Sequence, residues 1–122
     1  MDEMEMNFVL AKAGGRLEIV PAGTTIFSED EAGDCMYYLH RGCIDIIIDK
    51  KSIGQLGPGN IFGEMSLIDG SARSATVRTG EECEISRIDS DTFLALVKES
   101  PHVSLDIMRM LSGRLRRLNR LL

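Results

Sequence analysis

Histidine and cysteine, the residues that most often bind metals or form disulfides, are scarce in this sequence. His40 and His102 are the only histidines, and they form no H-x-H pair. The cysteines, Cys35, Cys43 and Cys83, are odd in number and far apart along the chain. A zinc site, a four-cysteine iron–sulfur cluster and a secreted disulfide framework are therefore not expected. We predict that the protein has no metal site and no cofactor.

Long apolar runs and a basic amino terminus are also missing. No window reaches the roughly 18 apolar residues of a transmembrane helix. The first residues, MDEMEM, are acidic, whereas a secretory signal peptide begins with basic residues. The sequence therefore predicts a cytoplasmic protein with no membrane span. Its 122 residues are enough for one domain with a hydrophobic core.

Positive charge is in deficit everywhere except near the C-terminus. Residues 1–105 have a charge balance of −9, whereas residues 106–122 carry five arginines and one acidic residue, a balance of +4. Nucleic-acid binding depends on clustered positive charge. We therefore expect no direct nucleic-acid binding by this chain, and we interpret the basic end as the solvated face of a helix.

Glycines recur along the chain at intervals of mostly nine to twelve residues and separate short β-prone segments. Turn signals at this spacing predict an all-β sandwich or barrel. In the segment CIDIIID, Ile44, Ile46 and Ile48 alternate with more polar positions, as in a strand that is buried on one face. Residues 50–52, Lys-Lys-Ser, are predicted to form a tight hairpin tip.

The pattern becomes helical after residue 89. Ser90 or Asp91 is predicted to cap a short helix that ends near Lys98. Ser100 and Pro101 are expected to begin a second helix that continues to the C-terminus, with Gly113 as its weakest position.

The predicted fold is a single, mainly β domain, an antiparallel β-roll (jelly roll). It has a lead-in over residues 1–15, the roll over 16–89 and helices over 90–122. We interpret the methionines of the lead-in, Met1, Met4 and Met6, as part of a frayed helix.

The most informative stretch is residues 62–77, FGEMSLIDGSARSATV. Gly63 allows a ligand to approach the backbone closely, and the following EMSLID is long enough for a short helix. The first backbone N–H groups of a helix attract anions, and the fork of Arg73 suits phosphate. Glu64 beside an anion makes sense if the ligand also has hydroxyl donors, as a ribose does. These residues predict a nucleotide pocket.

This stretch resembles the phosphate-binding cassette of the cyclic nucleotide-binding domain family. The family pattern F-G-E-apolar-small-L, followed by R-small-A-T/S-V, is met by residues 62–67 and 73–77, and the resemblance extends over about residues 16–118. Ala72 replaces the proline of many members, and the hydroxyl of Ser74 leaves the choice between adenine and guanine open.

The resemblance implies roles for individual residues. Glu64 would accept the ribose 2′-hydroxyl, and Arg73 would pair with the cyclic phosphate. The implied ligand-binding set is Gly63, Glu64, Met65, Ser66, Arg73, Ser74 and Ala75, with a base pocket of Ile61, Phe62 and Arg117. The expected function is a cyclic nucleotide sensor that prefers cAMP to cGMP and is not an enzyme.

Alternatives remain at this point. Glu64 and Arg73 could simply form an ion pair that closes a loop, in a degenerate module that binds no nucleotide. The chain could also be part of a larger transcription regulator or channel. Jelly rolls include cupin enzymes, which bind a metal through clustered histidines. The two histidines of this chain form no such cluster in the sequence, which argues against that class.

The terminal helix carries a further pattern. Apolar residues are spaced three and four apart, as in the seam of a two-stranded coiled coil. The stripe consists of Met108, Leu111, Leu115, Leu118 and Leu122. We predict that it forms a homodimer, although its first turns are expected to pack on the chain's own β-roll.

Overall fold

The computed structural model describes residues 16–120. The predictions for Met1, Met4 and Met6, and for Leu122 in the apolar stripe, lie outside the described residues. Among the helices of the described part, none is long and apolar enough to cross a membrane.

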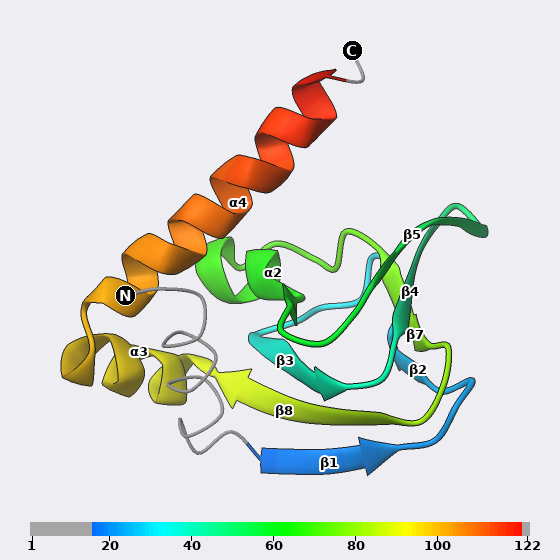
Figure 1. The fold of residues 1–122 in the computed structure, drawn as a ribbon, viewed down its shortest axis with the longest axis horizontal. Coiled ribbons are helices and arrows are strands. Elements are labelled where there is room, and N and C mark those ends of the chain that lie inside the picture. Colours follow the sequence, from blue (N-terminus) through cyan, green and yellow to red (C-terminus); the bar gives the residue numbers. More distant parts are fainter. Residues whose placement is uncertain (1–15, 121–122) are drawn as a thin grey trace.

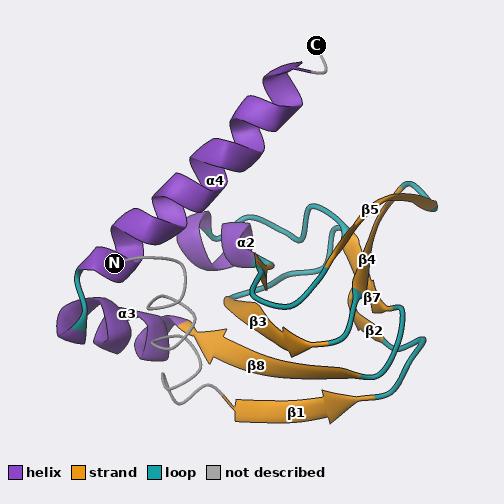
Figure 2. Cartoon of the chain, viewed as in Figure 1, coloured by secondary structure: helices purple, strands orange, loops and turns teal. Residues whose placement is uncertain are grey.

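Two four-stranded antiparallel sheets form the body of the molecule (Figures 1 and 2). The first has the order β1-β8-β3-β6, and the second has the order β2-β7-β4-β5. Their bounds are β1 Arg16–Val20, β2 Thr25–Phe27, β3 Cys35–Arg41, β4 Ile44–Ile48, β5 Lys51–Leu56, β6 Ile61–Phe62, β7 Thr76–Thr79 and β8 Cys83–Asp89. The mainly antiparallel β fold with C-terminal helices is thus confirmed.

The hairpin of β4 and β5 differs slightly from the prediction. Its turn lies at Asp49 and Lys50, which both have positive φ, the backbone of a type I′ turn. The predicted tip at residues 50–52 was therefore too late, because Lys51 already pairs with Ile48. A register shift leaves Ile53 as an extra residue opposite β4, since Ile46 pairs with Gly54 and Ile47 pairs with Ser52.

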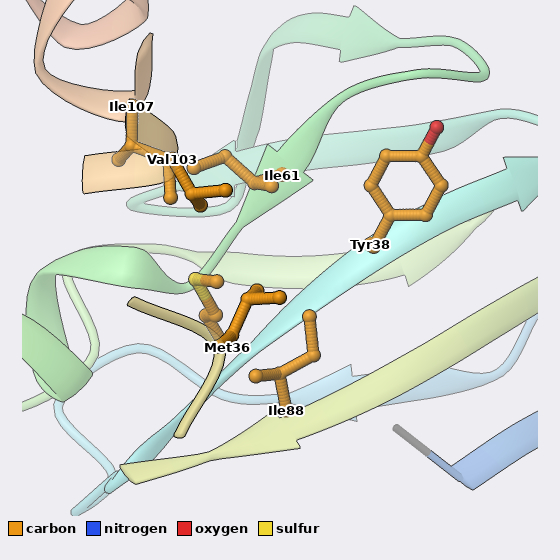
Figure 3. Packing of buried hydrophobic residues seen from close by; sticks show 7 residues of the cluster. Met36, Tyr38, Ile61, Ile88, Val103 and Ile107 are labelled. Atoms are coloured by element: carbon orange, nitrogen blue, oxygen red, sulfur yellow. The ribbon is translucent and has the colours of Figure 1, made fainter. Parts of the chain in front are cut away.

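Two apolar clusters fill the core. One lies between the sheets, and the other joins the first sheet to the helices. In the cluster that joins the first sheet to the helices, Val103 and Ile107 pack with Ile61 and Met36 (Figure 3). Burial of such aliphatic side chains stabilises a fold by about 1.5–3 kcal/mol each. This contact attaches the first turns of the last helix to the body.

The C-terminal helices are α3, Ser90–Glu99, and α4, His102–Arg120. The N-cap of α3 is Asp89, whose side chain accepts the Thr92 N–H at 2.8 Å, so the predicted cap at Ser90 or Asp91 was one or two residues late. α4 runs through Gly113 without interruption. Its last described turns project away from the sheets (Figure 1), and residues 115–120 are exposed.

Candidate functional site

A pocket of about 340 Å³ opens between the second sheet, the short helix α2, the loop before β7 and the last helix. A volume near this value is within the range of small-molecule sites. The lining residues are Phe27, Ile46, Ile48, Ile53, Leu56, Phe62, Gly63, Glu64, Met65, Ser66, Arg73, Ser74, Ala75, Val77, Arg114 and Leu118. Most of the wall is apolar, and its charged groups come from α2, the loop before β7 and α4.

The short helix α2, Glu64–Asp69, forms where the sequence predicted it. Gly63 and Gly70 flank it in left-handed conformations, with φ of 73° and 71°, which glycine adopts readily. A Cβ at Gly63 would lie 2.7 Å from Nη1 of Arg73 and 3.1 Å from the Phe27 ring. Glycine is thus required here by both the backbone conformation and the close approach of Arg73.

Arg73 is a buried cation, with 4% of its surface exposed. Its Nη1 donates to the backbone oxygens of Cys35 at 2.9 Å and Gly63 at 2.8 Å, and its Nη2 donates to the Cys35 Sγ at 3.4 Å. The guanidinium carbon lies 4.2 Å from the centre of the Phe27 ring, within cation–π range. Its Nε is buried and has no hydrogen-bond partner within the described part of the chain.

No carboxylate within residues 16–120 forms an ion pair with Arg73. A buried charge normally has a counter-charge, because leaving water without one is unfavourable. Arg73 is instead held by carbonyls, a sulfur and an aromatic face. The site therefore contains a positive charge that no carboxylate of residues 16–120 neutralises.

Glu64 is also buried, with 8% of its surface exposed, but its partner is not Arg73. Its Oε1 accepts from Nη1 of Arg114 at 3.1 Å, and Nη2 of Arg114 donates to the Ile61 backbone oxygen at 2.9 Å. The alternative of a Glu64–Arg73 ion pair is therefore wrong. Glu64 links α2 to α4, and no acidic residue of the described chain pairs with Arg73.

An aromatic group supports the Arg73 side of the site. Tyr37 stacks on Phe62 and Phe27, with ring centroids 5.2 and 5.8 Å apart. Burial, with a hydrogen bond to Cys35 as a second cause, raises the pKa of Tyr37 to about 12. This hydroxyl therefore stays protonated throughout the physiological pH range.

The structure brings together most of the residues that the sequence singled out. Gly63, Glu64, Met65, Ser66, Arg73, Ser74, Ala75 and, from the predicted base pocket, Phe62 all line the pocket. Ile61 does not. It is fully buried in the cluster beneath α4.

Arg117 also does not line the pocket, and its position on α4 is exposed. The lining residues from α4 are Arg114 and Leu118, which are four apart and share one face of the helix. Arg117 lies about 100° from Leu118 and about 60° from Arg114 at 3.6 residues per turn, at the edge of this face. The pocket-lining arginine of α4 is thus Arg114, whereas the sequence pointed to Arg117.

The apolar wall was not anticipated. Ile46 and Ile48 of β4, together with Ile53 and Leu56 of β5, line the pocket. The alternation in CIDIIID already placed Ile46 and Ile48 on one face of a strand. It did not reveal that the outer part of this face borders a cavity.

Comparisons with known proteins show the family of this chain. The model of the cyclic nucleotide-binding domain matches residues 17–100. The chain is 31% identical over 103 residues to the cyclic AMP receptor protein of Thermus thermophilus, covering 80% of this chain and 48% of that protein. It is 37% identical over 89 residues to a cyclic nucleotide-gated potassium channel of Rhizobium etli, covering 73% of this chain and 25% of the channel.

Solved structures show the same fold. The catabolite activator protein of Thermus thermophilus superposes with a TM-score of 0.82 at 27% identity, covering 98% of this chain and 57% of that one. A protein of a cyclic-GMP-dependent pathway in bacterial phytopathogenesis superposes with a TM-score of 0.82 at 28% identity, covering 96% of this chain and 95% of that one. The chain spans about half or less of the length of the curated relatives described above. It belongs to the cyclic nucleotide-binding domain family.

Proposed function

We propose that this domain is a sensor that binds a cyclic mononucleotide, with cAMP preferred to cGMP, and transmits binding through α4. The observation that carries the proposal is Arg73, a buried cation that lines the pocket and has, among residues 16–120, no acidic partner and no acceptor for its Nε. A cyclic phosphate supplies the missing negative charge and an acceptor for this donor. Ser66 and Ser74 line the pocket beside it.

The other charged end of the pocket suits a sugar. The Glu64 carboxylate lines the pocket while Arg114 occupies one side of it. A carboxylate accepts hydrogen bonds at both oxygens, so it can hold Arg114 and a ribose 2′-hydroxyl together. The distribution of charges, a cation for phosphate and an acceptor for hydroxyl, matches a cyclic nucleotide better than a simple anion.

The apolar wall suits a purine base. Ile46, Ile48 and Ile53 from the β4–β5 hairpin line the same pocket as Leu118 from α4. We propose that the base lies between the hairpin and Leu118, so that this chain supplies its own base cap. This wall has few polar groups to read the base edge, and we propose that the exposed Ser74, which also lines the pocket, does so.

The preference for cAMP is supported by relatives whose names state it. These include the cyclic AMP receptor protein of Thermus thermophilus and a cAMP-activated transcriptional regulator of Mycobacterium tuberculosis, 32% identical over 104 residues. The second candidate ligand is cGMP. It is favoured by the structural similarity to the protein of a cyclic-GMP-dependent pathway.

We propose further that the domain is not itself an enzyme and that it acts as a cytoplasmic homodimer through α4. Leu115 and Leu118 are 61% and 58% exposed, and Met108 is exposed as well. Leu111 packs partly against the core. An apolar stripe of this size favours a partner helix, and a second copy of α4 offers a matching one.

Titration calorimetry with cAMP, cGMP and a cyclic dinucleotide tests the ligand. We expect heat of binding with both mononucleotides, tighter for cAMP, and none with the dinucleotide. Absence of heat and of a thermal shift at millimolar cAMP and cGMP would contradict the proposal and support a module that binds no nucleotide.

A further inference from the structure

The two ends of the Arg73 guanidinium are held differently. Nη1 has two short bonds to backbone oxygens, those of Cys35 and Gly63. Nη2 has a longer contact, 3.4 Å, to the Cys35 sulfur, and Nε has no partner. The bonds at Nη1 involve only main-chain oxygens, so they anchor the guanidinium whatever side chain occupies position 35.

The Cys35 sulfur has a second donor besides Arg73. Arg87 Nε donates to it at 3.3 Å. Cysteine sulfur is a weak acceptor. The sulfur therefore binds Nη2 weakly and keeps the bond from Arg87 if Nη2 leaves.

We infer that the Cys35 sulfur is a displaceable partner of Arg73, exchanged for a phosphate oxygen when the ligand binds. The Nε–Nη2 edge of a guanidinium is the pair of parallel donors that a phosphate takes in bidentate fashion. Among the described residues, Nε has no acceptor and Nη2 is held only by the sulfur. Cys35 thus sets how readily Arg73 is released to the ligand.

The chemical type of residue 35 matters for this exchange. A carboxylate at this position would hold the Nε–Nη2 edge as an ion pair and compete with the phosphate. The natural carboxylate next to it, Asp34, does not take this role, because it is largely exposed and lies 3.8 Å from Arg87. A weak acceptor is therefore placed where a strong one would oppose binding.

This inference rests on the proposed function, so its test begins with the wild type. Calorimetry with cAMP is compared for wild type, Cys35→Ala, Cys35→Ser and Cys35→Asp, with thermal unfolding of each ligand-free protein. The matched control is Cys83→Ala, which removes another buried thiol, bonded to the backbone oxygens of Cys43 and Glu81 and not lining the pocket.

We expect Cys35→Ala to bind cAMP as tightly as wild type or up to roughly fivefold more tightly, the worth of one ordinary hydrogen bond. Its ligand-free form should unfold at a lower temperature, because Nη2 loses its partner. Cys35→Ser, with a better acceptor, should bind more weakly than wild type. Cys35→Asp should be weaker still, by about tenfold or more. Cys83→Ala should lose stability with unchanged affinity.

If Cys35 had a purely structural role, the variants would rank differently in cAMP affinity. Cys35→Ala would then lose stability and at least tenfold in affinity together, and that result would overturn the inference while leaving the proposed function intact. A wild type without affinity for cAMP or cGMP would instead refute the proposed function. If Cys35→Asp fails to fold, the order of the cAMP affinities of Cys35→Ala, wild type and Cys35→Ser still tests the inference.

Discussion

Arg114 of α4 lies 3.1 Å from Glu64 of α2, and it also donates to the Ile61 backbone oxygen. One side chain thus joins the last helix to the cassette and to the strand before it. We propose that a ligand that contacts Glu64 also acts on this link to α4. A ligand shifts such a helix only by its different affinity for the two helix positions, so the coupling is reciprocal.

Arg73→Ala should weaken cAMP binding much more than Glu64→Ala. Loss of one partner of a buried, charge-assisted contact costs ~2–5 kcal/mol, or roughly 30- to several-thousand-fold. Loss of the acceptor for a sugar hydroxyl should cost about 1–3 kcal/mol. Calorimetry on both variants measures the difference. Equal affinities for wild type and Arg73→Ala would mean that the phosphate binds elsewhere.

Arg114→Ala should destabilise the ligand-free protein by about 1–3 kcal/mol, because the buried Glu64 carboxylate loses a charged donor. Chemical denaturation gives this free energy of unfolding. Arg117→Ala is the matched control, since it removes the same side chain from an exposed position on the same helix. Equal losses in the two variants would show that the contact with Glu64 contributes nothing to stability.

Gly33→Ala should weaken cAMP binding by roughly tenfold or more, because the phosphate needs an aligned guanidinium edge. A Cβ at position 33 would lie 2.3 Å from Nε of Arg73 and would displace the guanidinium. Gly57→Ala is the control, since a Cβ there meets no atom within 4 Å. Unchanged affinity in Gly33→Ala would place the ligand away from this edge of Arg73.

Met108→Glu combined with Leu115→Glu should convert a dimer to a monomer. Both side chains are exposed and neither lines the pocket, so the charges fall on the predicted seam and spare the ligand site. Leu118 is avoided because it lines the pocket. Light scattering reports the mass, and calorimetry should show retained cAMP binding with altered affinity. A wild type that is monomeric at high concentration, with and without cAMP, would contradict both the dimer and any coupling between dimer formation and cAMP binding.

The sequence alone was sufficient for the features that depend on neighbouring residues. Glycine spacing and alternation indicated the antiparallel strands. The stretch from Phe62 to Val77 contains the short helix, its flanking glycines and Arg73 within one continuous segment. Turn conformation, helix ends and strand faces follow from local backbone preferences, which is why these predictions agree with the structure to within one or two residues.

Tertiary structure alone decided which residues complete the site. Arg114 meets Glu64 across 50 residues, and Cys35 meets Arg73 across 38. The face of α4 that reaches the pocket depends on how Val103 and Ile107 pack against the body. A helical stripe shows which residues share a face, but it does not show what that face meets. The partner of each buried charge was therefore determined by packing between distant segments.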